Sequence, residues 1–295
     1  MEVRGDLAGC VRPYQNDPPG LERTAALHTC RNRARGLHIR VSRQKIQLHG
    51  TPAAGCMITW LDPQRPLPPP STANEDGIVA LGNDLRVERL YEAYSRGIFP
   101  WPMGIRYIPW VSPDPRMVLH PGEIRVQRSL RKVLRNKGFS VTADRAFASV
   151  IDGCSQAPRP GQQGTWITSA MKSAYERAHE AGFAHSIETW LDGELVGGLY
   201  GISIGAMFCG ESMFFRVPDA SKVAFVTLYR QAMRWGFQFV DCQVYTEHTS
   251  SLGAREIPRD DYLTMLGRAV AMPGIRGPWT LDVVSTDVSD LPPLS

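Results

Sequence analysis

The sequence predicts an α+β protein in which a mixed sheet with flanking helices follows a small N-terminal domain. Three observations lead to this prediction: a hairpin signal in the second half of the chain, apolar residues with helical period on both sides of it, and a segment dense in proline and tryptophan before it. With 295 residues and 43% hydrophobic content, the chain can bury a full core. We therefore expect one larger α+β domain behind a smaller one.

Four segments are expected along the chain. Residues 1–56 show neither helical nor strand period and are predicted to be a disordered extension, with Met57 as a candidate for the natural start. Residues 57–122 are assigned to the small N-terminal domain and residues 123–272 to the larger domain. Residues 273–295 are then a C-terminal tail, for which the sequence predicts neither order nor disorder.

Charge and apolar runs limit the possible partners and the compartment. Residues 1–56 contain eight Arg, one Lys and four acidic residues, a net of +5, so the rest of the chain carries +4 − 5 = −1. Nucleic-acid binding therefore requires a local basic patch. No apolar run reaches the roughly 18 residues of a membrane span, and no signal peptide is recognisable, so we expect a cytoplasmic protein without a membrane partner. The six cysteines form no CxxC pair, so free thiols and no metal are expected.

The small domain is expected to begin its helical part after Asp84. This residue is predicted to cap a helix that Gly97 ends. Segment 97–116 follows, and its prolines prevent regular structure while its tryptophans supply large rigid faces. Two interpretations stay open: a tryptophan-anchored loop between domains, or a set of stacking surfaces for a nucleobase.

The larger domain begins with a basic stretch in which Glu123 is the acid that opposes the cations. Residues 128, 131, 132 and 135 follow helical spacing, so one helix face carries four positive charges. Such a face is either solvated surface or a track for phosphates, and the lack of balancing acids favours nucleic acid. The predicted phosphate-contacting residues are Arg125, Arg128, Arg131, Lys132 and Arg135.

The centre of this domain is predicted to be an antiparallel meander. Asp192-Gly193 is a dipeptide that suits a two-residue hairpin turn. The expected elements, in order, are a helix over 168–181, strands over 186–191, 194–200 and 206–215, a helix from Ser221 and a strand over 237–244.

Glu211 lies in the apolar strand 207–214, where an unpaired carboxylate is costly to bury. It therefore needs either a structural ion pair or a role in binding a cationic ligand or a reacting amine. Asp241 and Gln243 are two residues apart in the last strand, so we expect their side chains on one face, with the Asp241 carboxylate holding the Gln243 amide. Cys242 points to the opposite face. Together with His248 it suggests a Cys–His nucleophile, but a lone cysteine in an apolar strand is more often a core residue.

In their order and amino-acid sequence, several motifs resemble those of the leucyl/phenylalanyl-tRNA–protein transferase family over about residues 57–272. Residues 1–56 lie outside the resemblance. The motifs that carry it are Gly97–Trp101, Trp110–Arg116, Gly164–Thr168, Phe208–Phe214, Asp241–Val244 and Ser251–Ala254.

The resemblance implies an enzyme that moves Leu, Phe or Met from aminoacyl-tRNA to proteins beginning with Arg or Lys and so marks them for N-degron degradation. It implies a larger domain similar to the GCN5-related acetyltransferase fold, without a cofactor. It further implies that Asp241 orients Gln243, whose carbonyl receives a hydrogen from the attacking amine, and that Glu211 belongs to the same site. Trp101 and Trp166 are implied to hold the terminal adenosine of the tRNA. The implied aminoacyl pocket consists of Leu199, Met213, Phe225 and Val240, with leucine at 199 where the family leads us to expect methionine.

Two other functions remain as alternatives. The first is a coenzyme A-dependent N-acetyltransferase on the same fold. The turn over 216–222, where such enzymes cradle pyrophosphate, has no glycine and carries an acid, which disfavours coenzyme A. The second alternative is a non-catalytic RNA-binding module that uses the basic helix.

Overall fold

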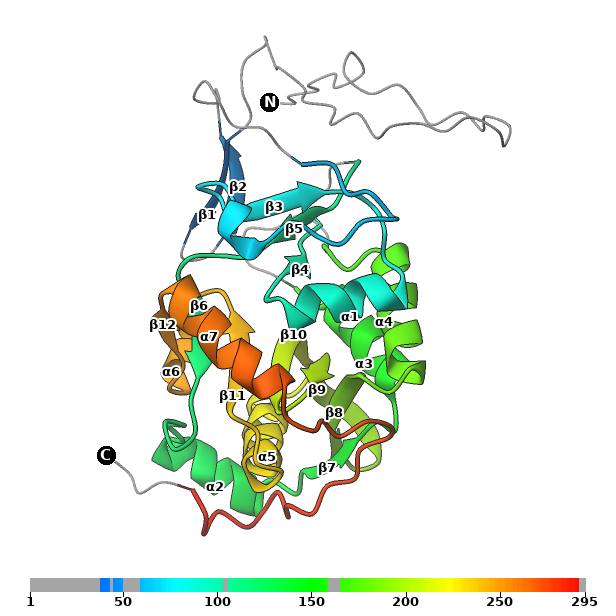
Figure 1. The fold of residues 1–295 in the computed structure, drawn as a ribbon. Coiled ribbons are helices and arrows are strands. Elements are labelled where there is room, and N and C mark those ends of the chain that lie inside the picture. Colours follow the sequence, from blue (N-terminus) through cyan, green and yellow to red (C-terminus); the bar gives the residue numbers. More distant parts are fainter. Residues whose placement is uncertain (1–37, 43–44, 50–58, 103–105, 159–164, 292–295) are drawn as a thin grey trace, which may run out of the picture.

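The computed structural model of the chain describes residues 38–42, 45–49, 59–102, 106–158 and 165–291. In the described part of the chain a seven-stranded mixed sheet forms the centre of the molecule (Figure 1). Its strands, in spatial order, are β12 (Arg255–Ile257), β6 (Arg116–Leu119), β11 (Phe239–Gln243), β10 (Met207–Phe215), β9 (Glu194–Ile204), β8 (Ala184–Leu191) and β7 (Ser140–Ala143).

The predicted meander, helix and strand are confirmed in that order. Strands β8, β9 and β10 pair antiparallel, α5 (Ala220–Arg234) follows, and β11 pairs parallel to β10. The parallel pairing arises because a helix separates β10 from β11 and returns the chain to the starting edge of β10. The fold class predicted from the sequence, an α+β mixed sheet with flanking helices behind a small domain, is therefore confirmed.

Helices cover both faces of this sheet. One face packs against α1 (Val87–Ser95), α3 (Phe147–Gln156), α4 (Ser169–Glu180) and α7 (Arg259–Val270). The other face packs against α2 (Arg128–Asn136) and α5, whose buried residues form a second apolar cluster. The short α6 (Glu247–Ser251) connects β11 to β12. We call these sides the α4 face and the α5 face.

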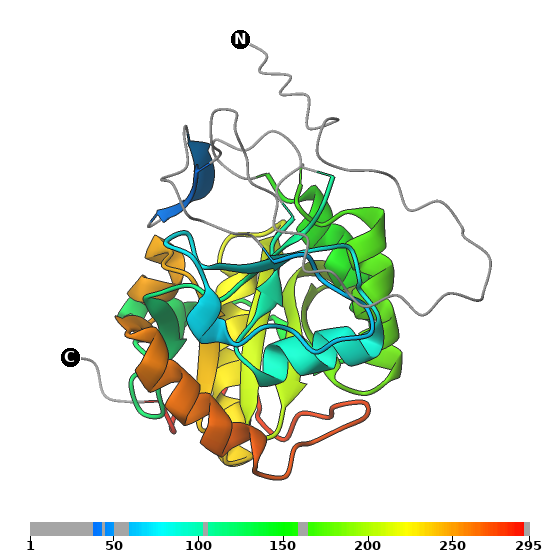
Figure 2. The same ribbon diagram turned by 45° about the horizontal axis from the view of Figure 1, so that its top comes forward.

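The small N-terminal domain contains a three-stranded sheet in the order β3 (Ile78–Leu81), β5 (Pro109–Val111) and β4 (Phe99–Pro100), with the short 3-10 turn Pro70–Thr72 before it. Helix α1 of this domain contacts α7 of the larger one, and Figure 2 shows the two helices beneath the small sheet. Strand β6 belongs to the seven-stranded sheet, so that sheet begins at Arg116, before residue 122. Segment 97–116, expected to lack regular structure, thus supplies the two short strands β4 and β5 and the first residue of β6.

The expected cap of α1 is wrong. The N-cap residue is Arg86, and it makes no side-chain capping bond. Asp84 instead accepts hydrogen bonds from the side chains of Arg86 and Arg89, and the Arg86 bond holds the pKa of Asp84 near 2 despite partial burial. A carboxylate between two guanidinium groups finds stronger partners there than a backbone N–H.

Of the extension predicted over 1–56, most lies outside the described residues. The part that is described forms an antiparallel hairpin of β1 (His38–Ser42) and β2 (Lys45–His49). The expectation of disorder in the rest of the segment, and of a start at Met57, stays a prediction.

The segment after α7 is packed against the larger domain as far as Leu291. The Trp279 ring stacks on His185 with centroids 3.8 Å apart, and its backbone N–H donates to Asp144. Further along, Arg230 of α5 pairs with Asp290 at 2.6 Å. The tail thus covers the end of the sheet and one side of α5. No helix within the described ranges is both long and apolar enough to span a lipid bilayer.

Candidate active site

The site forms where the pairing of β10 and β11 ends. The parallel register runs from Met207↔Phe239 to Cys209↔Asp241 and goes no further. Beyond it, Glu211 and Gln243 face each other through their side chains, with the Gln243 Nε2 atom 2.7 Å from the Glu211 Oε1 atom. The two strands predicted to hold the site therefore do meet there.

Asp241 is fully buried and forms an ion pair with Arg116, which was not among the site residues predicted from the sequence. Its carboxylate accepts two bonds from Arg116 of β6, at 2.9 Å from Nε and 2.6 Å from Nη2. Tyr262 of α7 donates a third bond at 2.8 Å. Burial alone would lower the pKa of Arg116, but the charge and the hydrogen bonds of Asp241, together with the neighbouring Tyr262, outweigh burial and raise that pKa above its ordinary value.

The link between Asp241 and Gln243 differs from the predicted one. The Asp241 Oδ1 atom accepts from the backbone N–H of Gln243 at 2.8 Å, whereas the side-chain amide of Gln243 points to Glu211. The reason is a register shift in β11 between these residues, which puts Gln243 at a φ of 62°. A side chain held at positive φ costs roughly 1–2 kcal/mol, so the bond from Asp241 offsets this strain.

The Gln243 carboxamide is held by its nitrogen. Nε2 donates to Glu211 and lies 3.4 Å from the Cys209 sulfur, while the described residues donate no hydrogen bond to Oε1. A carboxamide has two donor hydrogens on nitrogen and acceptor lone pairs on oxygen. Since its donors are directed at the protein, the carbonyl oxygen is the part that can receive a hydrogen from a ligand.

Glu211 is bound by hydroxyl and amide groups instead of cations. Tyr175 of α4 donates to its Oε2 atom at 2.7 Å, and the Tyr94 hydroxyl of α1 lies 2.6 Å from that of Tyr175. Within the described ranges no arginine or lysine forms an ion pair with Glu211, which removes the structural ion pair as an explanation. Burial raises the pKa of Glu211 to about 7, in spite of these hydrogen bonds. This carboxyl group can therefore gain or lose a proton near neutral pH.

Replacing Glu211 with Gln is expected to alter the pH dependence of stability. Because its folded-state pKa is raised, Glu211 favours the folded state fully below its unfolded pKa of 4.5, and this contribution is lost as the pH rises through about 7. The Tm of the unmodified protein should therefore fall relative to that of Glu211→Gln between about pH 5 and pH 8. Thermal melts of both proteins across this range measure the difference.

Glu188→Gln is a matched control for this prediction. Glu188 is also buried, and burial raises its pKa as well, but it bonds to Ser186 and Thr142 away from the site. Both variants should change the pH dependence of stability. Only Glu211→Gln should also change the pH profile of catalysis, and a similar change in Glu188→Gln would count against a site-specific role for Glu211.

Trp101 and Trp166 are brought together as a pair. Trp101 follows β4 and Trp166 precedes α4, and both are half-buried. Their rings are nearly parallel, with an interplanar angle of 11° and centroids 6.5 Å apart. Bases stack at intervals of about 3.4 Å, so two intervals make about 6.8 Å, close to the observed spacing. Their role at the terminal adenosine stays a prediction.

The four residues predicted to line an aminoacyl pocket also lie together. Leu199, Phe225 and Val240 are buried in the apolar cluster on the α5 face, and Met213 is partly buried against it. Cys209, which contacts Gln243, belongs to the cluster on the α4 face. The four predicted pocket residues and the Cys209–Gln243 contact are thus reached from opposite faces of the sheet. That the four residues form an aminoacyl pocket stays a prediction.

The basic face is confirmed as a helix, α2, with Leu130 and Leu134 turned into the core. Figure 1 shows α2 at the bottom of the molecule, below the small sheet to which β4 belongs. Arg131 is only half-exposed, and its Nε donates to the Val126 carbonyl. The exposed cations of the predicted patch are Arg125, Arg128, Lys132 and Arg135.

The Cys–His nucleophile is not supported. Cys242 packs against the cluster on the α5 face, and burial raises the pKa of its thiol. Burial likewise raises the pKa of Cys209 well above its ordinary value. A thiol acts as a nucleophile through its thiolate, which these surroundings disfavour. In the described part of the chain no group of His, Cys, Asp and Glu is arranged to hold a metal ion.

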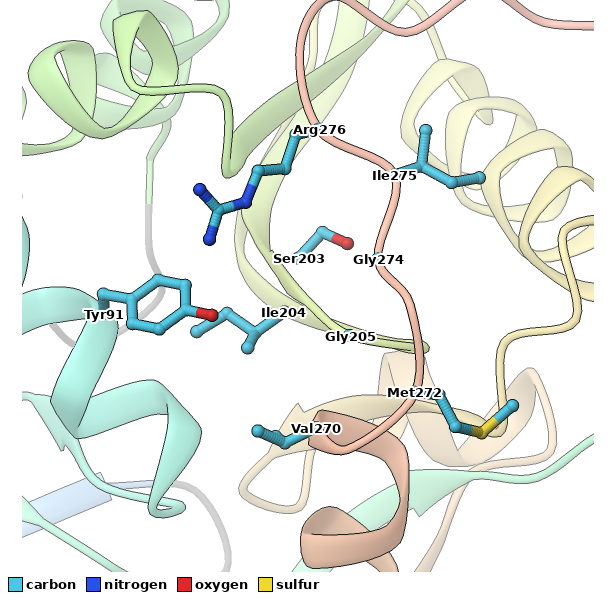
Figure 3. A pocket seen from close by; sticks show the side chains of 9 residues that line it. All are labelled: Tyr91, Ser203, Ile204, Gly205, Val270, Met272, Gly274, Ile275 and Arg276. Atoms are coloured by element: carbon cyan, nitrogen blue, oxygen red, sulfur yellow. The ribbon is translucent and has the colours of Figure 1, made fainter.

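A separate pocket lies at the far end of β9, and Figure 3 shows its lining. None of the predicted site residues lines it. Arg276 and Tyr91 enter it from two segments, with the guanidinium carbon 5.5 Å from the ring centroid. The lining residues are Tyr91, Ser203, Ile204, Gly205, Val270, Met272, Gly274, Ile275 and Arg276.

Sequence reasoning missed four residues of the site: Arg116, Tyr262, Tyr94 and Tyr175. Tyr94 and Tyr175 lie among the buried, mostly apolar residues of α1 and α4. A signal was available, because a buried tyrosine hydroxyl requires a partner and two of them on facing helices imply a polar group nearby. No comparable signal pointed to Arg116 or Tyr262.

The sheet order places the chain in the α+β class, and the carboxamide held by a buried carboxylate marks its candidate active site. Profiles of the leucyl/phenylalanyl-tRNA protein transferase family match residues 118–267, and those of its N-terminal domain match residues 83–114. A protein of Myxococcus xanthus with the name leucyl/phenylalanyl-tRNA–protein transferase is 57% identical over 213 residues, which cover 72% of this chain and 91% of that protein. Its namesake in Thiobacillus denitrificans is 58% identical over 217 residues, 73% of this chain and 95% of that one. The chain belongs to the leucyl/phenylalanyl-tRNA protein transferase family.

Among solved structures, a GCN5-related N-acetyltransferase from Kribbella flavida is similar to 57% of this chain and 59% of its own, with a TM-score of 0.29 and 13% identity. The structure of L-PGS from Bacillus licheniformis is similar to 52% of this chain and 49% of its own, with a TM-score of 0.31 and 11% identity.

Proposed function

We propose that this protein transfers Leu, Phe or Met from aminoacyl-tRNA to the N-terminal Arg or Lys of acceptor proteins and so marks them for N-degron degradation. The observation that carries the proposal is the Gln243 carboxamide, whose nitrogen is held by Glu211 and whose oxygen is left to receive a hydrogen. An attacking α-amine supplies such a hydrogen. Family membership supports aminoacyl-tRNA as the donor and a protein as the acceptor.

The reaction is aminolysis of an ester. The α-amino nitrogen bonds to the ester carbonyl carbon, the bond from that carbon to the ribose oxygen breaks, and the amine proton ends on the ribose hydroxyl. The ester already contains the free energy for amide formation, so the reaction needs no ATP. With an α-amino pKa of roughly 7.7–8.0, forming the free amine near pH 7.5 costs well under about 1 kcal/mol.

Positioning is therefore the main contribution of the enzyme. Holding amine and ester in attack geometry supplies roughly 7–11 kcal/mol, whereas general acid–base assistance supplies roughly 10²–10⁴-fold in rate. In the proposal, Gln243 Oε1 accepts a hydrogen from the amine and directs its lone pair to the ester. Glu211 fixes the carboxamide and, with a pKa of about 7, can also accept a proton as the amine becomes an amide.

The remaining parts of the substrate are assigned to neighbouring features. The terminal adenine binds between Trp101 and Trp166, whose spacing is close to two stacking intervals. The aminoacyl side chain enters the apolar cluster on the α5 face through the place where β10 and β11 cease to pair. Helix α2 contacts phosphates further along the tRNA.

The test is a comparison of donors. The protein is incubated with a peptide that begins with Arg and with either radiolabelled Leu-tRNA or labelled acetyl-coenzyme A. Label on the peptide from the tRNA alone is expected. Label from acetyl-coenzyme A alone would establish the N-acetyltransferase alternative, and tRNA binding without transfer would establish the RNA-binding module. A peptide that begins with Asp serves as the acceptor control.

A further inference from the structure

Arg116 and Tyr262 enclose the Asp241 carboxylate from two elements that are distant in the sequence. All three side chains are at most 1% exposed. The Arg116 guanidinium also lies against the faces of Phe99 and Tyr262, 4.7 Å and 4.4 Å from their ring centroids, and donates to the Gly97 carbonyl. The position of the Arg116 guanidinium is therefore fixed by contacts additional to its bonds with Asp241.

Each of the two carboxylate oxygens of Asp241 already accepts two hydrogen bonds. Oδ1 accepts from Arg116 and from the Gln243 backbone, and Oδ2 accepts from Arg116 and from Tyr262. No lone pair is left to contact a substrate, so Asp241 acts on the reaction through Gln243. A buried ion pair is weak evidence for stability, because desolvation opposes the attraction of the charges.

The bond from Asp241 holds Gln243 in the left-handed region, with φ at 62°. If Gln243 relaxed to an extended conformation, the alternation of a strand would turn its side chain away from Glu211. The position of the carboxamide thus depends on a carboxylate whose own position depends on Arg116 and Tyr262.

We propose that Arg116 and Tyr262 are positioning residues for the transfer reaction, which act by keeping Asp241 in place to hold the backbone of Gln243. This inference rests on the proposed function of Gln243. It adds that residues of α7 and β6 determine, through Asp241 and Gln243, how the reacting amine is held.

Tyr262→Phe is the variant that tests it, because it removes the hydroxyl that donates to Asp241 and accepts from Arg116 and leaves the ring in place. The expected result is a fall in kcat of about 10-fold with the KM for aminoacyl-tRNA unchanged within about 2-fold. In a Gln243→Ala background the same substitution should cause no further fall, since it acts through the missing side chain. An equal fall in both backgrounds, or an unchanged kcat in the single variant, would overturn the proposal.

Tyr229→Phe is the matched control. Tyr229 is also buried, and its hydroxyl accepts from the Gly122 N–H and donates to the His120 carbonyl. This variant should lose thermal stability to a similar extent and keep its kcat. A comparable fall in kcat would show that general loosening, and not the position of Asp241, explains the effect of Tyr262→Phe.

A readout that does not depend on catalysis separates this inference from the proposed function. Amide hydrogen exchange at Gln243 should be at least about 10-fold faster in Tyr262→Phe than in the unmodified protein, because its backbone N–H is less firmly held by Asp241. An unmodified protein that transfers no leucine would refute the proposed function while this measurement still tests the structural claim. Unchanged exchange at Gln243 would refute the inference even in an active enzyme.

Discussion

Gln243→Ala is expected to lower the rate of aminoacyl transfer by about 10²–10⁴-fold, the range typical of losing a general acid–base group. The affinity for aminoacyl-tRNA should change by less than about 2-fold, because the carboxamide contacts the attacking amine and not the tRNA. Alanine and glutamine are similarly strained at positive φ, so the fold should persist. Single-turnover rates and equilibrium binding of Leu-tRNA measure the two quantities separately.

Gln238→Ala supplies the control, since Gln238 lies just before β11 but is exposed, and within the described part of the chain its side-chain amide bonds only to the Gly236 carbonyl. Its transfer rate should equal that of the unmodified protein. If Gln243→Ala also retained full turnover, the carboxamide would have no part in the reaction, and Glu211 would become the first candidate for receiving the amine proton.

Replacing the exposed cations of α2 is expected to weaken tRNA binding and to flatten its dependence on salt. The variant changes Arg128, Lys132 and Arg135 to Gln and leaves Arg131 in place, because Arg131 is bonded to the Val126 carbonyl. Each lost phosphate contact lowers the slope of log K against log salt by about 0.7–0.9, so the slope should fall by about 2–3. At about 0.15 M salt this corresponds to roughly 10²-fold weaker binding.

A variant with the same loss of charge on other surfaces is the appropriate control. Arg65, Arg145 and Arg268 are exposed and lie outside α2. Their replacement by Gln should change the slope much less than the α2 variant does. Equal slopes in the two variants would mean that α2 is a solvated face and that tRNA binding responds only to total charge.

The alternation of polar and apolar residues revealed which strands hold the site, but not how its groups are connected. Glu211 stands out because a carboxylate in an apolar strand demands a partner, and this holds whatever the partner is. Asp241 and Gln243 stand out for the same reason. Their predicted contact was wrong in its atoms because strand period assumes a regular ladder, and the register shift in β11 breaks that ladder at Gln243.

Contacts between distant segments could not be predicted in this way. Arg116 lies in a segment whose prolines argued against regular structure, yet it occupies a strand that neighbours β11. Gly97 is another example. Its positive φ suits the helix end that the sequence predicts, but a Cβ there would lie 2.8 Å from the Tyr262 ring, a constraint that exists only once α1 and α7 are packed together.

The sequence by itself determined the α+β class, the meander with its following helix and strand, the basic helix, and the three polar residues on β10 and β11. These follow from local rules, since residue period, turn dipeptides and the cost of burying charge act within one segment. Only the tertiary structure decided that Arg116 and Tyr262 enclose Asp241, that Tyr94 and Tyr175 reach Glu211, and that the Gln243 amide is held by its nitrogen. These contacts join residues that are far apart along the chain, and a hydrogen bond depends on distances of a few tenths of an ångström that only the packed fold fixes.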